Sequence, residues 1–187
     1  MDREGVAAAE DLRDAENWTG GFYELILILG AADGDRLDRA VGALWRAAGV
    51  RECRAGAELV DVVPGADAFA VDGHLRGTLT LPSGARVVCG SYTTSYEGIE
   101  LGGLVRVDER IGGYPFDQRS GVESLAWRAP LDRWLADIAV AVYADVPFTR
   151  ALIGFEVDED ADSTAGTAYT ARLTPGTDGM DYQPATS

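Results

Sequence analysis

The sequence contains no lysine, and all sixteen of its basic residues are arginine. It has one histidine, His74, and two cysteines, Cys53 and Cys89. These shortages exclude a Schiff-base lysine, the lysine of a P-loop, a histidine-rich metal site and a Cys-x-x-Cys redox pair. Asparagine occurs once, and lysine and asparagine codons are both AT-rich. The missing lysine therefore indicates the coding bias of a GC-rich, bacterial type of genome more than a functional choice.

Long apolar runs are also missing. The densest apolar segment, Leu25–Leu29, ends at Gly30 and is far shorter than the roughly 20 residues that a membrane-spanning helix needs. The N-terminus, Met1–Glu4, is acidic and lacks the basic-then-apolar order of a secretory signal. We therefore expect a cytoplasmic protein with reduced thiols.

Positive charge is scarce relative to negative charge, and the net charge is −15. Residues 1–17 hold six acidic residues and two arginines, and residues 156–187 hold seven and one. Such a negative field opposes binding to nucleic acids and anionic membranes. It favours encounter with a basic protein partner, although acidic ends also simply keep a protein in solution.

The residues that are present predict alternating strands and helices. Phe22–Leu29 is apolar apart from Glu24 and predicts a strand covered on both faces. Asp33 and Asp35 then suit the start of a helix that runs to Ala48, with Gly49 as its C-terminal cap. These features make residues 22–49 a β–α unit.

The middle of the chain predicts strands. Residues 58–63 form a short strand, and residues 75–81 and 86–89 form a hairpin around Pro82-Ser83-Gly84. The return strand continues toward Tyr96, and a further strand is expected at 99–107. Residues 108–121 form a long loop.

A second helix is expected in two pieces divided at Pro130, which suits a first helical turn. Its apolar stripe includes Leu131, Leu135 and Ile138, which leaves Asp132 among the residues that face water. Residues 148–157 give the last strand, and residues 167–174 alternate enough to add an edge strand.

The resulting order, β-α-β-β-β-β-α-β, predicts an α+β fold with a single antiparallel or mixed sheet and two helices on one face. A ferredoxin-like arrangement with inserted strands satisfies this order. We expect an acidic N-terminal extension at residues 1–17, one domain at 18–157 and an acidic tail with little structure at 158–187.

Familiar chemical motifs are incomplete. Residues 158–162 begin like a calcium loop, but its twelfth position is Tyr169 where a bidentate glutamate is needed. The Gly30–Gly34 turn lacks the second glycine of a dinucleotide-binding loop. His74 is expected in a turn without a special role, and a general base is the alternative. Cys89 fits an apolar strand, and Cys53 lies in a charged, exposed segment.

Two regions have the composition of binding surfaces. One is the hydroxyl-rich strand end that carries Tyr92, Tyr96 and Glu97, with Arg106 in the next strand, and the other is the loop that carries Tyr114, Phe116 and Arg119. Packing of the loop aromatics onto the core and surface ion pairing account for these residues equally well. We expect no metal and no cofactor.

The leading hypothesis is a non-enzymatic protein-binding or accessory module, one form of which neutralises or scaffolds a basic partner as an immunity protein does. The alternative is a small-molecule-binding protein or enzyme with a pocket between sheet and helices that is lined by Tyr, Arg and Glu. A homo-oligomer built on a sheet edge or on the Tyr114 loop is a third hypothesis. Catalytic residues are not identified, and a cavity where those side chains converge would favour the alternative.

Overall fold

The computed structural model describes residues 12–18, 22–31, 33–95, 99–106, 121–155, 157 and 170–185. The helices are α1 (Gly34–Ala48) and α2 (Gly121–Asp145), with 3-10 turns η2 (Ala15–Trp18) and η3 (Ala66–Ala70). The strands are β1 (Phe22–Gly30), β2 (Arg54–Ala55), β3 (Val60–Asp61), β4 (His74–Thr80), β5 (Arg86–Ser95), β6 (Ile99–Arg106), β7 (Arg150–Phe155), β8 (Ala171–Gly176) and β9 (Gly179–Gln183). Two helices with antiparallel strands confirm the α+β class.

The strands form two antiparallel groups. One contains β2, β4, β5 and β6, with the two-residue β3 at its edge, and the other contains β1, β7, β8 and β9. The groups meet where β1 pairs with β6, from Phe22 opposite Arg106 to Gly30 opposite Ile99, so that the hydrogen-bonded order is β3-β2-β4-β5-β6-β1-β7-β8-β9. The single sheet of the prediction is therefore observed as two four-stranded groups that the β1–β6 pairing joins, and β2, β8 and β9 are additional to the six strands of the predicted order.

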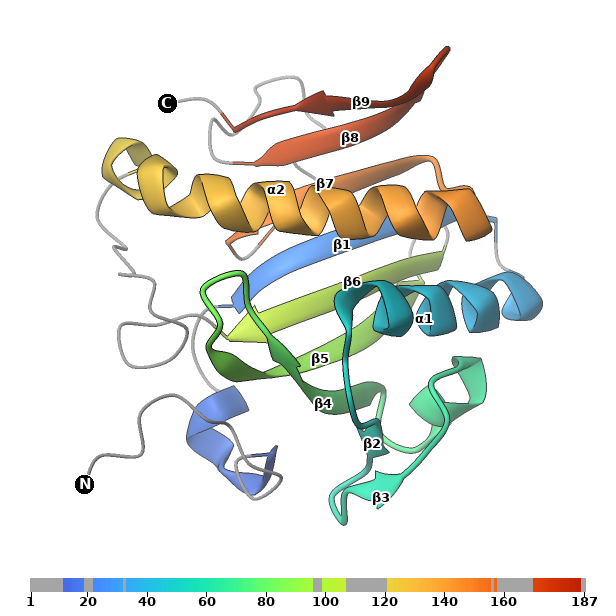
Figure 1. Cartoon of the computed structure of the whole chain (residues 1–187). Helices are drawn as coiled ribbons and strands as arrows, with labels where there is room; N and C mark the ends of the chain where they lie inside the picture. The colour runs from blue at the N-terminus through green and yellow to red at the C-terminus, as the bar shows by residue number, and fades with distance from the viewer. Residues whose placement is uncertain are drawn as a thin grey trace.

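Both helices lie on one face of the strands, with α1 over the β4–β6 side and α2 over β1 and β7 (Figure 1). Alternate strand residues point toward them, and these residues form the main core together with the buried faces of the helices. Among the largest fully buried side chains are Leu25, Leu27 and Leu101. The core thus lies between the helices and this face of the strands.

The first β–α unit forms as predicted. The Asp33 side chain accepts hydrogen bonds from the backbone N–H groups of Asp35 and Arg36, which caps the start of α1. Gly49 ends the helix with a φ of 67°, in the left-handed region where a residue without Cβ is favoured. The predicted β4–β5 hairpin also forms, and Gly84 in its turn has a φ of 89°.

The second helix does not divide at Pro130. It is continuous from Gly121 to Asp145 with Pro130 inside, so the expectation of two pieces is wrong. Proline removes one backbone hydrogen bond from a helix interior and crowds the preceding turn. Burial of Leu131, Leu135 and Ile138 offsets this cost, because these side chains anchor α2 to the core.

Two segments outside the expected domain of residues 18–157 pack against it. Residues 171–183 lie in the expected tail, yet they form the hairpin β8–β9, and β8 pairs with β7 from Ala151 opposite Leu173. At the other end, Leu12 is buried against Leu59 and Val88, with Trp18 packed beside them. Both segments are ordered because their apolar side chains are buried against the rest of the fold.

No helix in the described part of the chain is long and apolar enough to cross a membrane.

Candidate functional site

The predicted binding residues fall mainly outside the described residues: this is the case for Tyr96, Glu97, Tyr114, Phe116 and Arg119. Tyr92 is half-buried in β5 and pairs with His74 on one side and Gly102 on the other. Arg106 ends β6 and pairs with Phe22. The backbone positions of Tyr92 and Arg106 are therefore about 14 Å apart along the strands, four residues at about 3.4 Å each.

The described residues form a cleft near Tyr92. Its volume is about 260 Å³, close to the lower end of ordinary ligand pockets. It is lined by Trp18, Phe22, His74, Leu75, Arg76, Gly90 and Ser91, and we call it the Trp18 cleft. Aromatic rings, a guanidinium and an imidazole thus surround one space.

The Trp18 cleft lies on the face of the strands opposite the helices. Leu75 and Leu79 belong to the main core beneath the helices, so the intervening Arg76 side chain points the other way. There it meets Trp18, which packs in the small cluster of Leu12, Leu59 and Val88. Trp18, in the segment before β1, therefore forms a wall of the cleft on this face of β4 and β5.

Gly90 creates the floor of the cleft. It pairs with Arg76 in β4 and with Leu104 in β6, in the middle of the strands. A glycine leaves the surface of a sheet bare where any other residue would place a side chain. The missing side chain at Gly90, between Arg76 and Leu104, leaves the space that forms the hollow.

Arg76 is held in place by two contacts. Its Nη1 donates to Oδ2 of Asp72 at 2.8 Å, and its guanidinium carbon lies 5.5 Å from the centre of the Trp18 ring. Partial burial by itself raises the pKa of Asp72, but hydrogen bonds from Arg76 and from the His74 backbone, with the charge of Arg76, lower it on balance. The one charged side chain among the described lining residues is thus paired with a carboxylate.

His74 is exposed at the rim of the cleft, and its backbone N–H donates to Oδ1 of Asp72 at 3.2 Å. Its Nδ1 lies 3.0 Å from the backbone carbonyl oxygen of Asp72. Since a carbonyl only accepts, this contact requires the proton on Nδ1, which leaves Nε2 as an acceptor whenever the ring carries one proton. Among the described residues, no carboxylate side chain bonds to the imidazole as in a catalytic dyad.

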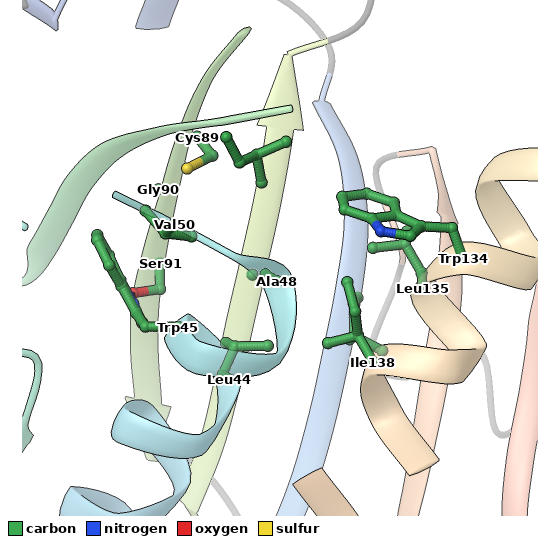
Figure 2. A pocket seen from close by; sticks show the side chains of 13 residues that line it. Leu44, Trp45, Ala48, Val50, Cys89, Gly90, Ser91, Trp134, Leu135 and Ile138 are labelled. Atoms are coloured by element: carbon green, nitrogen blue, oxygen red, sulfur yellow. The ribbon is translucent and has the colours of Figure 1, made fainter. Parts of the chain in front are cut away.

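A second, smaller cavity lies between the two helices and the strands. Figure 2 shows Trp45 and Leu44 of α1 on one side and Trp134, Leu135 and Ile138 of α2 on the other. Its volume is about 30 Å³, enough for one or two water molecules. The lining is almost wholly apolar, and its Ser91 accepts a hydrogen bond from Trp45 Nε1 at 3.2 Å. None of the seven predicted binding residues is among its described lining, so the expected pocket of Tyr, Arg and Glu is not found there.

A buried polar cluster lies under α2. The Tyr23 hydroxyl donates to Oδ1 of Asp132, and Arg128 Nε donates to the Tyr23 oxygen at 2.8 Å. Asp132 is only 4% exposed, so the prediction that it faces water is wrong. The contacts with Tyr23 and Arg128 explain this position, because a buried carboxylate needs partners. Burial raises the pKa of Asp132 although Tyr23 and Arg128 act against the shift.

Both cysteines are buried and free. Burial raises the pKa of Cys53 to about 11, and burial also raises the pKa of Cys89. The exposed position predicted for Cys53 is therefore wrong, since its neighbours carry the charges while its thiol packs inward. Within the ranges that the structure describes, no three His, Cys, Asp or Glu side chains gather as metal ligands do. The calcium-like run at 158–162 lies outside the described residues.

Sequence reasoning missed Trp18, Phe22, Arg76 and Gly90 as members of one site. Two signals were present: Arg76 alternates with the apolar Leu75 and Leu79, and Gly90 interrupts a strand. The strand register that places Arg76 beside Gly90 has no signal in the residues of either strand.

Three comparisons with known proteins found no counterpart. No family model, no curated protein and no solved structure matches this chain. The site therefore has to be interpreted from its own geometry.

Proposed function

We propose that this chain is a non-enzymatic binding protein that holds a small planar molecule in the Trp18 cleft. The observation that carries the proposal is the cleft itself: a hollow of about 260 Å³ walled by Trp18 and Phe22 and floored by Gly90. A flat ligand gains from stacking and from removal of apolar surface from water. Binding rather than bond-making is supported by the buried thiols and by the backbone-bonded His74.

The test is an NMR titration of the whole chain with indole, a small planar and uncharged probe. We expect saturable shifts that centre on the backbone amides of Arg76 and Gly90. Shifts that centre on α1 and α2, or no saturable shift, would contradict the proposal.

A matched pair of variants makes the test specific. Trp18→Leu removes a wall of the Trp18 cleft, and Trp134→Leu removes an equally half-buried indole from the opposite face. We expect Trp18→Leu to weaken indole binding by about tenfold, in line with a stacking contact of about 1–3 kcal/mol. Trp134→Leu should leave the affinity within about twofold.

A basic protein partner is the second candidate. The net charge of −15 supports it, together with the exposed carboxylates of Asp33, Asp35 and Asp67 around α1 and η3. Binding of this kind depends steeply on ionic strength, because charge attraction dominates encounter. A pull-down at low salt should recover a basic partner that 0.5 M salt releases. A partner retained at high salt, or none, would count against it.

The finer fold assignment and the location are proposals too. The segments β1-α1-β5-β6-α2-β7, with strand order β5-β6-β1-β7, support a ferredoxin-like core into which β2 to β4 are inserted. The two free thiols support a reducing, cytoplasmic location.

A further inference from the structure

We propose that the Trp18 cleft selects uncharged planar aromatic ligands over anionic ones, and that Asp72 sets this selectivity by neutralising Arg76. The inference rests on the proposed function, because it names the class of ligand for the same site. It adds a specificity residue that lies beside the cleft and acts through Arg76.

The first step concerns charge. A guanidinium in a cleft ordinarily attracts carboxylates and phosphates. Here Asp72 already holds Nη1 of Arg76 at 2.8 Å, and the side chains of both residues are largely covered, at 21% and 27% exposure. An anionic ligand has to displace this partner or share its cation, so Arg76 offers it little net attraction.

The second step concerns shape and stacking. The Arg76 guanidinium carbon lies 5.5 Å from the centre of the Trp18 ring, so a cation–π contact already stands at the wall of the cleft. A planar ring can pack against this pair over Gly90, which contributes only backbone to the lining of the cleft. The ligand therefore gains by being flat, without needing a charge.

The third step concerns the surrounding field. The chain carries a net charge of −15, which lowers the local concentration of anions near its surface. His74 Nε2, left as an acceptor, favours a ligand that donates a hydrogen bond. Together these features favour a neutral aromatic with an N–H group over an aromatic carboxylate.

The experiment compares three probes of nearly equal size: benzamide, benzoate and benzamidinium. Their affinities are measured by NMR titration with the whole chain at low salt. We expect benzamide to bind about tenfold more tightly than benzoate, a difference that the pairing of Arg76 and the negative field together can supply. Benzamidinium shares the ring and reverses the charge, so it reports the negative field together with direct contacts to Asp72 and Arg76.

Asp72→Asn tests the assigned role. Asparagine keeps an oxygen for the His74 backbone N–H but removes the charge that neutralises Arg76. Benzoate should then bind at least about fivefold more tightly, while benzamide stays within about twofold. Asp61→Asn is the matched control, because it changes the net charge equally at a carboxylate that pairs with Arg54 and does not line the cleft. It should leave benzoate unchanged.

The outcomes separate the two proposals. If none of the probes binds the wild-type chain or Asp72→Asn, the proposed function fails. If benzamide binds at the cleft but benzoate binds equally well, or if Asp72→Asn and Asp61→Asn act alike on benzoate, the selectivity is overturned while the ligand site stands.

Discussion

On the helix-covered face of the strands, apolar side chains fill nearly all the space and leave a cavity of about 30 Å³. On the opposite face, the same strands leave a cleft of about 260 Å³. Gly90 and Ser91 line both hollows, so the two spaces are separated by little more than the backbone of β5. The same strands border both hollows. The difference in volume therefore results from the segments that cover each face: two helices on one, and the segment with Trp18 on the other.

Polar groups follow the same contrast. Beneath the helices, Tyr23, Arg128 and Asp132 satisfy one another and are each at most 4% exposed. On the opposite face, Arg76 and His74 stand at a hollow where a ligand can reach them. Buried polar groups that bind one another hold a structure together, whereas those at an open cleft can recognise something else.

The largest expected loss of stability comes from a substitution that breaks the buried cluster of Tyr23, Arg128 and Asp132. Arg128→Met leaves the Asp132 carboxylate buried without its cation, and we expect the free energy of unfolding to fall by about 3–5 kcal/mol. Urea denaturation at neutral pH measures this loss. A loss below about 1 kcal/mol would show that the cluster is not a stabilising element.

A control for this experiment lies five residues further along α2. Arg133→Met removes an exposed arginine whose guanidinium carbon lies 5.5 Å from the Tyr182 ring centre. We expect it to cost no more than about 1 kcal/mol, the range of an exposed cation–π contact. If Arg128→Met is too unstable to purify, Tyr23→Phe tests the same cluster with an expected loss of about 1–3 kcal/mol.

An intermediate loss of stability is expected when a glycine on the helix-covered face of the strands is replaced, in comparison with a glycine on the opposite face. At Gly77, an added Cβ would lie 2.3 Å from the Glu52 carbonyl oxygen and 2.9 Å from the Trp45 ring. Gly77→Ala should therefore cost about 1–3 kcal/mol through overpacking. Gly90→Ala instead projects into the Trp18 cleft and should change stability by no more than about 1 kcal/mol.

Urea denaturation and the indole titration together measure both variants. Gly90→Ala should weaken indole binding because it raises the floor of the cleft. Equal losses of stability at Gly77 and Gly90 would contradict the contrast between a filled and an open face.

The smallest effect is a difference in pH dependence. The raised pKa of Asp132 means that its contribution to stability is greatest below the unfolded pKa of about 3.9 and falls as the pH rises through the folded pKa. The lowered pKa of Asp72 has the opposite sign: its contribution is present above about 3.9 and is lost as the pH falls through the folded pKa.

Urea midpoints measured across the acid range distinguish the two carboxyls. In Asp132→Asn, stability should fall less as the pH rises above about 3.9. In Asp72→Asn, stability should fall less as the pH drops below about 3.9. Identical profiles for the two variants would contradict these assignments.

The sequence by itself determined the local elements, because their causes are local. The cap at Asp33, the left-handed Gly49 and the turn at Gly84 each act within a few residues, and α1, its preceding strand and the β4–β5 hairpin form as predicted. The alternation of Arg76 with Leu75 and Leu79 likewise fixed which side chains share a face.

Only the tertiary structure decided the sites, because they depend on contacts between residues far apart in the chain. Tyr23 and Asp132 are 109 residues apart, yet they share a hydrogen bond, and no pattern near Asp132 signals that partner. Trp18 reaches Arg76 through packing of a segment that looks like a loose extension in the sequence. Register between strands placed the bare Gly90 beside Arg76, and pairing free energy depends on all the strands together rather than on either residue.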